Sequence, residues 1–259
     1  MNIVVCVKQV PDTAGERKLR ADDARLDREA ADGLINELDE YAIEEALLLK
    51  EAHGGEVTVL TMGPDKATES IRKALSMGAD KAVHLVDDAL AGSDALATSY
   101  ALAQVLRSIG FDLVVVGAES TDARMGAMAA MLAERLGVPQ LSLASKVEID
   151  GSTIRIHRQS EDGYQVVEGA LPAVIGVVEK INEPRYPSFK GIMAAKKKPV
   201  QTMSLADAGI EPSLVGLANA ATEVVDFADR PPRQAGTIVK DEGDGGVKAA
   251  EFLAAQKFI

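Results

Sequence analysis

The segment Gly117–Gly126 combines the residue types that hold a phosphate group in proteins. Its sequence, GAESTDARMG, brings hydroxyls, glycines and the cation Arg124 together between an apolar run and a helical pattern. The hydroxyls of Ser120 and Thr121, with backbone amides at the start of the helix, could hold a phosphate against the helix dipole, and Arg124 could add charge-assisted hydrogen bonds. The alternative is capping of the helix by Thr121 or Asp122, and taken by itself the segment favours capping.

Residues 182–201 have the composition of a docking surface. The sequence NEPRYPSFKGIMAAKKKPVQ contains prolines, two aromatic rings, the pair Ile192–Met193 and the run Lys196–Lys198. No core strand is expected, because proline cannot donate to a ladder and adjacent ammonium groups are costly to bury. A stiffened loop with apolar side chains beside positive charge is more often a docking device than a linker. The alternative is an ordinary basic surface turn.

The sequence offers no catalytic or metal-binding set. His53, His84 and His157 fall in none of the spacings of metal sites, so we expect them to be structural or solvated. The carboxylates Glu44 and Glu45 are expected to decorate the polar face of a helix. A Gly-x-Gly-x-x-Gly fingerprint after the first strand, a phosphate-binding Walker loop and a Gly-x-Ser-x-Gly elbow are all missing. The sequence therefore favours a non-catalytic subunit over an enzyme, and we expect no metal.

Four strand–helix units are predicted to position the first segment. The strands are expected at Ile3–Val7, Val57–Met62, Lys81–Val86 and Leu113–Val116, and the helices at Asp39–Ala52, Asp65–Met77, Asp94–Ile109 and Met125–Leu136. This alternation predicts a doubly wound, mostly parallel α/β sheet with right-handed crossovers. Such a sheet binds ligands beyond the carboxyl ends of its strands, where strand order reverses. Those ends are the Lys8–Asp12 loop, the Met62–Pro64 turn and the Gly117–Gly126 loop.

An antiparallel extension is predicted after Pro139. Short alternating runs on either side of Asp150-Gly151 predict a hairpin, and two further strands follow. The four strands are expected at Lys146–Ile149, Thr153–Arg158, Tyr164–Glu168 and Ala173–Val178.

The C-terminal part is predicted to form an arm that packs on a partner subunit. Residues 205–229 are irregular, Arg230–Arg233 (RPPR) is a rigid connector, and Asp241–Gly246 is an acidic, glycine-rich spacer before a helix at Val247–Lys257. A helix separated from its domain by such a spacer usually packs on something else. We therefore predict a nucleotide-binding α/β domain over residues 1–229, including the docking segment, and a C-terminal arm and helix over residues 230–259.

Composition narrows the function further. The chain has 259 residues with 47% hydrophobic content and a net charge of −12, which argues against general nucleic-acid binding. The single cysteine, Cys6, excludes an intrachain disulfide and is expected to be a buried, inert thiol. The start of the sequence shows no secretory signal, and no apolar run approaches the roughly 20 residues of a membrane helix. We expect a cytoplasmic protein.

Several separated segments resemble one family. They are Val5–Asp12, Asn36–Asp39 with Tyr41–Ala46, Met62–Pro64, Ala74–Asp80, Arg158–Val167 with Leu171–Val174, Asn182–Lys198 and Arg230–Gly236. Together they are similar to the beta subunit of electron transfer flavoprotein over essentially the full length. Gly176 departs from the family signature, which has a small hydroxyl residue, alanine or cysteine at that position.

The resemblance implies a heterodimer with an alpha subunit that holds most of the FAD, while the beta subunit binds AMP. It implies electron transport from acyl-CoA dehydrogenases and other dehydrogenases of fatty acid beta-oxidation to the membrane-bound electron transfer flavoprotein quinone oxidoreductase. The residues that match AMP contacts are Cys6, Asn36, Glu37, Leu38, Asp39, Met62, Gly117, Ala118, Glu119, Ser120, Thr121, Asp122, Ala123, Arg124, Met125, Gly126, Ala127 and Met128. The residues that match the partner-docking loop are Pro184, Arg185, Tyr186, Phe189, Ile192, Met193, Lys196, Lys197 and Lys198.

Two alternatives stay open at this point. Many family members have GKQAID where this chain has Gly117–Asp122, and Arg124 is the candidate replacement for the missing lysine. A subset of the family that bifurcates electrons places a second FAD where the others bind AMP. The alternative from another class is a free-standing adenine-nucleotide-binding module without a flavin partner.

Phe189 stands where the family presents a leucine at the tip of its docking loop.

Overall fold

The computed structural model describes residues 1–15, 17–228, 231–232, 236 and 238–259. The chain divides into two compact units, Met1–Val224 and Val225–Ile259. The predicted domain boundary at residues 229–230 and both arginines of the predicted Arg230–Arg233 connector lie outside the described residues, so these remain predictions.

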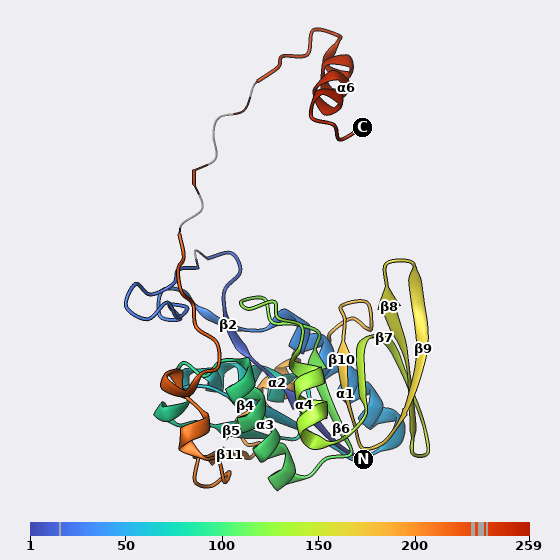
Figure 1. Cartoon of the computed structure of the whole chain (residues 1–259). Helices are drawn as coiled ribbons and strands as arrows, with labels where there is room; N and C mark the ends of the chain where they lie inside the picture. Colours follow the sequence, from blue (N-terminus) through green and yellow to red (C-terminus); the bar gives the residue numbers. More distant parts are fainter. Residues whose placement is uncertain (16, 229–230, 233–235, 237) are drawn as a thin grey trace. The chain divides into compact units, whose positions relative to one another are not determined.

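The first unit is built on one large sheet (Figure 1). In the described part of the chain it has nine strands in the order β11-β5-β4-β1-β6-β10-β7-β8-β9, and a separate antiparallel pair joins β2 to β3. The strands are β1 (Asn2–Cys6), β2 (Gln9–Pro11), β3 (Gly33–Ile35), β4 (Glu56–Met62), β5 (Lys81–Leu85), β6 (Leu113–Gly117), β7 (Gln140–Asp150), β8 (Thr153–Ser160), β9 (Gly163–Ala170), β10 (Ala173–Val177) and β11 (Val200–Met203). Pairing from β11 through β7 is parallel, which confirms the doubly wound α/β fold.

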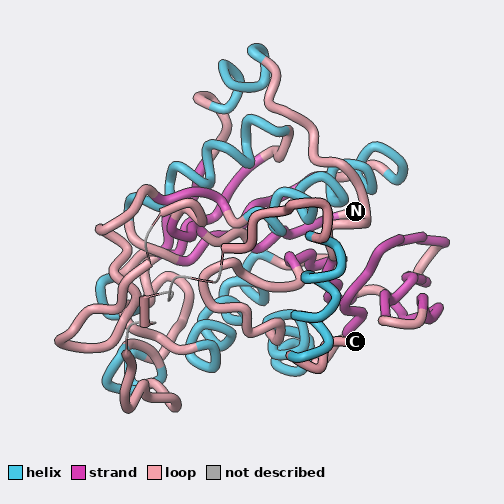
Figure 2. The backbone as a smooth tube through the Cα atoms, turned by 90° about the horizontal axis from the view of Figure 1, so that it is seen from above, coloured by secondary structure: helices cyan, strands magenta, loops and turns pink. Residues whose placement is uncertain are grey.

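Helices cover both faces of the sheet, as the view from above in Figure 2 shows. The helices of the first unit are α1 (Glu37–His53), α2 (Thr68–Met77), α3 (Ala95–Ile109), α4 (Met128–Leu136) and α5 (Phe189–Ala195), and the second unit contains α6 (Gly245–Ala255). Alternate residues of each strand supply two apolar cores. Val5 packs with α1 and α2 in one core, and Val4 packs with α3 and α4 in the other.

The strand β10 corrects one prediction. Ala173–Val178 was assigned to the antiparallel extension, but β10 lies between β6 and β7 and pairs parallel with both. All five of its residues are buried, which is typical of a central parallel strand. Within the described part of the large sheet, the antiparallel pairs are β7 with β8 and β8 with β9.

The segment 182–201 also differs from the expected loop. Its middle forms α5, which starts with Ser188 as the N-cap, and its end enters β11. The Oγ of Ser188 accepts a hydrogen bond from the amide of Gly191 at 3.0 Å, which satisfies a first-turn donor of the helix. The prediction of a stiffened loop was therefore wrong for Phe189–Ala195, because a seven-residue helix is too short to show an apolar period.

The second unit contains the predicted C-terminal helix. α6 begins at Gly245, two residues earlier than expected, so part of the predicted spacer belongs to the helix. Asp241 accepts hydrogen bonds from the amides of Gly243 and Gly245 and thereby orders the turn before it. Val247, Phe252 and Leu253 are exposed apolar side chains of this helix. Among the residues that the structure describes, no helix combines the length and apolarity needed to cross a membrane.

Candidate functional site

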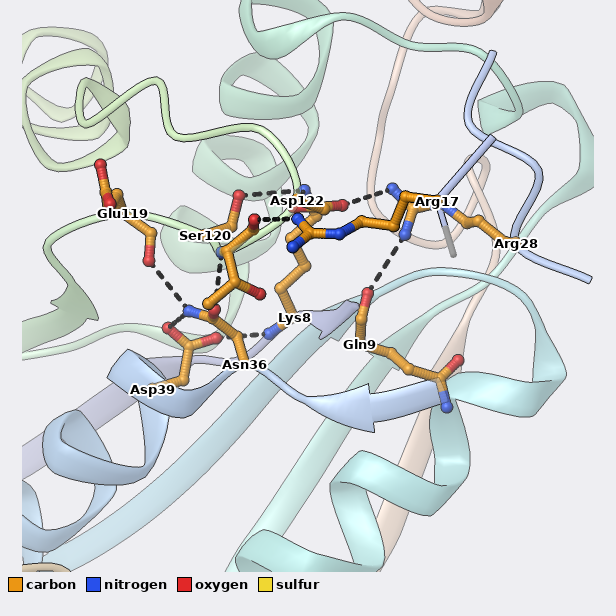
Figure 3. Close-up of polar contacts among 10 residues, drawn as sticks. Lys8, Gln9, Arg17, Arg28, Asn36, Asp39, Glu119, Ser120 and Asp122 are labelled. Carbon is orange, nitrogen blue, oxygen red and sulfur yellow. Dashed lines mark hydrogen bonds and ion pairs between the residues drawn. The ribbon is translucent and has the colours of Figure 1, made fainter. Parts of the chain in front are cut away.

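The strand order reverses between β1 and β6. From β1 the chain adds β4 and β5 on one side and then crosses to β6 on the other. The carboxyl ends of β1 and β6 therefore flank the switch point where open sheets bind ligands. The loop after β1, the start of α1 and the loop after β6 meet there, as Figure 3 shows for Lys8, Asn36, Asp39, Ser120 and Asp122. We call these five residues the switch-point cluster.

Asn36 is the centre of this cluster and is 1% exposed. Its Nδ2 donates to Asp39 Oδ1 at 2.9 Å and to the Glu119 carbonyl at 3.0 Å. Its Oδ1 accepts from the Thr121 amide at 3.0 Å. One amide side chain thus joins the start of α1 to the loop after β6, and both of its ends are satisfied.

Asp39 is buried beneath Asn36. Its Oδ2 accepts from the Lys8 amide at 2.7 Å. Burial raises the pKa of Asp39 to about 7, although hydrogen bonds from Lys8, Asn36 and the Gly117 amide partly oppose this rise. A Cβ at Gly117 would lie 2.6 Å from Asp39 Oδ1, so only glycine permits this approach of β6 to α1.

Asp122 carries the strongest ion pairs of the site. Its two oxygens accept from Lys8 Nζ at 2.7 Å and from Arg28 Nη2 at 2.9 Å, while its side chain is 2% exposed. Burial pushes the pKa of Asp122 upward, but the two cations and the hydrogen bonds from Lys8 and Ser120 outweigh it and lower the pKa to about 2. Arg17 Nη1 donates to the Thr121 carbonyl at 2.6 Å. The loop after β6 is therefore held by three cations.

The start of α4 has no side-chain cap. Its N-cap is Ala127, which offers no side-chain cap, so the predicted capping by Thr121 or Asp122 was wrong. Thr121 Oγ1 is buried and has no hydrogen-bond partner within the part of the chain that the structure describes. A buried hydroxyl without a partner carries a desolvation cost that a polar ligand would remove. Arg124 is largely exposed, 3.6 Å from Glu119, with φ of 48°.

The structure brings most of the predicted nucleotide-site residues to this edge. Cys6 and Met62 end β1 and β4, Asn36 and Asp39 begin α1, and the Gly117–Met128 stretch follows β6. Cys6 is buried, as predicted, and burial raises the pKa of its thiol to about 12, with the charge of Asp39 adding to the rise.

Three cations of the site were not predicted. Lys8 directly follows β1 and was noticed only as a loop residue. Arg17 and Arg28 lie in the excursion between β2 and β3, where no hydrophobic period marks a structure. The pair of Arg28 and Asp122 joins residues 94 positions apart, so no local pattern could have indicated it.

The docking segment, residues 182–201, presents apolar side chains above a polar base. Tyr186 is 91% exposed and Phe189 81%, with Ile192 and Met193 half exposed beside them. Arg185 and Lys198 belong to the base instead. Arg185 Nε donates to Glu44 Oε2 at 2.7 Å, and Lys198 Nζ donates to the carbonyls of Leu75 and Ala79.

Burial corrects one further expectation and bears out another. Glu44 and Glu45 do not decorate an exposed helix face, because both are buried and contact Arg185 and Asn182 of the docking segment. His84 is buried with its Nε2 at 3.0 Å from the Gly63 carbonyl, which is the expected structural role. No group of three His, Cys, Asp or Glu residues that could hold a metal occurs among the described residues.

Comparison with known proteins identifies the family. The family model described as electron transfer flavoprotein domain matches residues 23–208. Electron transfer flavoprotein subunit beta of Mycobacterium tuberculosis is 54% identical, with 100% of this chain and 99% of the relative covered. The chain belongs to the electron transfer flavoprotein family, as a beta subunit. The beta subunit of Clostridium acetobutylicum is 39% identical over 99% of this chain and 97% of its own, and protein FixA of Azorhizobium caulinodans is 42% identical over 86% and 83%.

Membership confirms the resemblance seen in the sequence. A beta subunit of an electron transfer flavoprotein is part of an electron carrier, and the family implies both a flavin and an alpha subunit as its partner. The alternative of a free-standing module without a flavin partner is thereby set aside. The switch-point cluster and the docking segment are consequently features of a beta subunit.

Proposed function

We propose that this beta subunit is the non-catalytic half of a cytoplasmic heterodimer that carries electrons in fatty acid beta-oxidation. The heterodimer accepts electrons from acyl-CoA dehydrogenases and other dehydrogenases and passes them to the membrane-bound electron transfer flavoprotein quinone oxidoreductase. FAD supplies the redox chemistry when bound and is held mainly by the alpha subunit. The beta subunit contributes a nucleotide site, a docking surface and a C-terminal arm for its partner.

The nucleotide site is proposed at the switch point, with AMP as its structural ligand. The observation that carries this is the buried Thr121 hydroxyl, which has no partner among the described residues and belongs to the loop leading to α4, a helix without a side-chain cap. Backbone amides of α4 and the cations Lys8 and Arg28 favour a phosphate there. The residues that would hold AMP are Cys6, Asn36–Asp39, Met62 and Gly117–Met128. Arg124 belongs to the loop after β6 and its side chain is largely exposed, as expected of a residue that could close on a phosphate.

Acid precipitation of the purified protein tests this site. We expect AMP to be released at close to one molecule per chain, because a nucleotide enclosed by the loops after β1 and β6 exchanges slowly. Recovery of a second FAD per heterodimer in place of AMP would assign the protein to the bifurcating subset. Recovery of neither nucleotide would contradict the site.

Docking to dehydrogenases is proposed for the segment 182–201, with Phe189 as its anchor. The observation that carries this is the exposure of Tyr186 and Phe189 beside the half-exposed Ile192 and Met193. Exposed apolar groups of this kind mark interaction sites, and an aromatic anchor in a pocket contributes about 2 kcal/mol or more. Phe189→Ala should therefore raise the KM of an acyl-CoA dehydrogenase for the heterodimer about thirtyfold. AMP content and heterodimer stability should not change, and an unaltered KM would contradict the docking role.

The C-terminal arm is proposed to bind the alpha subunit. Val247, Phe252 and Leu253 are exposed apolar side chains on α6, and binding to a partner subunit would bury them. Truncation at Glu242 should weaken heterodimer formation, measured by sedimentation, while thermal stability of the beta subunit stays constant. An equal loss of stability in the isolated beta subunit would show that the helix packs on its own chain.

A further inference from the structure

The docking segment is fastened to α1 at its base. Arg185 donates from its backbone amide and its Nε to Glu44 Oε2, at 3.1 and 2.7 Å, and from Nη2 to Glu44 Oε1 at 2.9 Å. Its remaining Nη1 donates to Glu51 Oε1 at 2.7 Å. Asn182 Nδ2 adds hydrogen bonds to the Tyr41 carbonyl and to Glu45 Oε2, each at 3.1 Å. All of these acceptors belong to one helix.

The burial of this contact favours arginine over lysine at position 185. The Glu44 side chain is 6% exposed and the Arg185 side chain 34%. A carboxylate in that position needs a cation with several donors, because each unsatisfied oxygen would add a desolvation cost. The planar fork of arginine reaches Glu44 and Glu51 together, which a lysine ammonium does not match. With Nε, Nη1 and Nη2 all directed at α1, the guanidinium has little donor capacity left for a docking partner.

The far end of the segment is fastened as well. A Cβ at Gly191 would lie 2.5 Å from the Ser76 carbonyl, so α5 lies directly against the end of α2. Lys198 Nζ donates to the carbonyls of Leu75 and Ala79, at 2.9 and 2.6 Å, and so closes the same helix end. Between these two attachments the chain exposes Tyr186 and Phe189.

We propose that Arg185 is a positioning residue that presents the Tyr186–Met193 surface in its binding conformation, and that it is not itself a contact with the dehydrogenase. The proposal rests on the docking role of segment 182–201. Its physical basis is preorganisation, since a loop already fixed on α1 and α2 loses little conformational freedom when a partner binds. Freed from α1, the same exposed side chains would have to be ordered during each encounter, which weakens binding without removing any contact.

The test compares variants on the two sides of the contact, using the heterodimer as electron acceptor of an acyl-CoA dehydrogenase. Arg185→Ala should raise KM about tenfold and leave kcat unchanged. Glu44→Ala, which removes a side chain too buried to touch a partner, should raise KM by a similar factor. The double variant should be no worse than either single one, because both remove one interaction. Glu51→Ala, at an exposed position, should have a smaller effect of about threefold and tests the contact if the buried variants fail to assemble.

Two further readouts separate positioning from direct contact. Hydrogen exchange of the amides from Tyr186 to Lys197 should accelerate in Arg185→Ala. Arg185→Lys keeps the charge but not the fork, so it should restore less than half of the lost affinity. Arg155→Ala serves as the control, because it removes an exposed arginine paired with Glu168 on β9 and should leave KM unchanged.

Each outcome that would contradict the proposal points to one specific part of it. If Arg185→Ala raises KM while Glu44→Ala and Glu51→Ala do not, or if Arg185→Lys restores full affinity, the guanidinium contacts the partner and positioning is wrong. If hydrogen exchange accelerates in Arg185→Ala but KM stays constant, preorganisation has no role in docking. If Phe189→Ala leaves KM unchanged, the docking function itself fails, irrespective of Arg185.

Discussion

The switch-point cluster and the docking segment use the same residue types in opposite ways. In the switch-point cluster, Asn36 contacts Asp39, Lys8 contacts both Asp39 and Asp122, and the side chains of Asn36, Asp39 and Asp122 are almost entirely buried. In the docking segment, Arg185 and Asn182 hold the chain from below while Phe189 points away from its base and is 81% exposed. The switch-point cluster buries its polar groups, whereas the docking segment uses its polar groups to hold an exposed apolar surface in place.

The difference follows from what each region is proposed to bind. A nucleotide phosphate is recognised by donors whose positions are fixed in advance, so the loops around it must be joined by hydrogen bonds that leave few alternatives. A protein surface is recognised largely through apolar area and a few anchors, so the polar groups serve as foundation. Variants that weaken the polar contacts of one region or the other show whether those contacts differ in their contribution to the free energy of unfolding.

The largest effect is expected at Asn36. Asn36→Ala removes the side-chain partner of the Thr121 amide, of the Glu119 carbonyl and of Asp39 Oδ1, so the free energy of unfolding should fall by about 3 kcal/mol or more. AMP content should fall in parallel, because both loops of the site lose their connection. Urea unfolding and nucleotide release measure the two effects. Asn219→Ala is the control, because it removes an exposed asparagine whose side-chain amide donates to the Val215 carbonyl. An equal loss of stability in that variant would show that the hydrogen bonds of Asn36 are not exceptional.

Asp122→Asn should cost about 2 kcal/mol at pH 7. The pKa of Asp122 is about 2 in the folded protein against 3.8 ordinarily, so its ionised form stabilises the fold. This contribution is complete above about pH 4 and is lost as the pH falls toward 2, so wild type and variant should converge there. Asp22 makes a comparable control, since its pKa is also lowered to about 2, chiefly by the hydrogen bond from Arg20, but its side chain is 65% exposed.

Urea unfolding at several pH values from 7 down to about 2 measures both variants. Asp22→Asn should lose much less stability than Asp122→Asn, because solvent and salt screen its ion pair. A loss in Asp22→Asn as large as that in Asp122→Asn would show that burial does not distinguish the two pairs.

In the docking segment, Gly191→Ala should lower the free energy of unfolding by about 1 to 2 kcal/mol. The added methyl group would stand 2.5 Å from the Ser76 carbonyl, so α5 must move away from α2. Gly246→Ala in α6, where an added methyl group meets nothing, is the matched control and should not destabilise the protein. Unchanged stability in Gly191→Ala would mean that the close packing of α5 on α2 carries little energy.

The smallest effect separates two neighbouring lysines. Lys198→Ala should lower the free energy of unfolding by about 1 kcal/mol, because two carbonyls at the end of α2 lose their donor. Lys197→Ala should leave stability unchanged and instead weaken the salt dependence of dehydrogenase docking, since Lys197 is exposed. Thermal unfolding and stopped-flow kinetics at several salt concentrations check this pair. Identical behaviour of the two variants would contradict the division.

The parts of the fold that depend on local sequence patterns could be predicted from the sequence. Alternating strands and helices, with glycines at helix ends, were sufficient for the parallel sheet and for the loops at its carboxyl edge. The resemblance in Asn36–Asp39 and Gly117–Met128 placed the candidate nucleotide site at that edge. These features depend on residues that are close in the chain.

The rest depends on residues that are distant in the chain. Arg185 and Glu44 are 141 positions apart, and Arg28 and Asp122 are 94 apart, so neither pair leaves a periodic signal. The sequence therefore suggested a solvated Glu44 and a docking Arg185, whereas burial joins them. The strand Ala173–Val177 was placed by its neighbour in the chain, β9, although its unbroken apolar run is typical of a strand covered on both faces.

The position of β10 determines the order in which the molecule can be completed during synthesis. β7, β8 and β9 pair with one another, but only β10 connects them to β6. The whole antiparallel ribbon is therefore translated before the strand that attaches it to the sheet exists. At about 5 to 20 residues per second, the growing chain carries a ribbon with no strand partner in the parallel sheet, and an open edge on β6, until Ala173–Val177 leaves the ribosome. A chain that stops before this strand leaves β7 without the strand that joins it to β6.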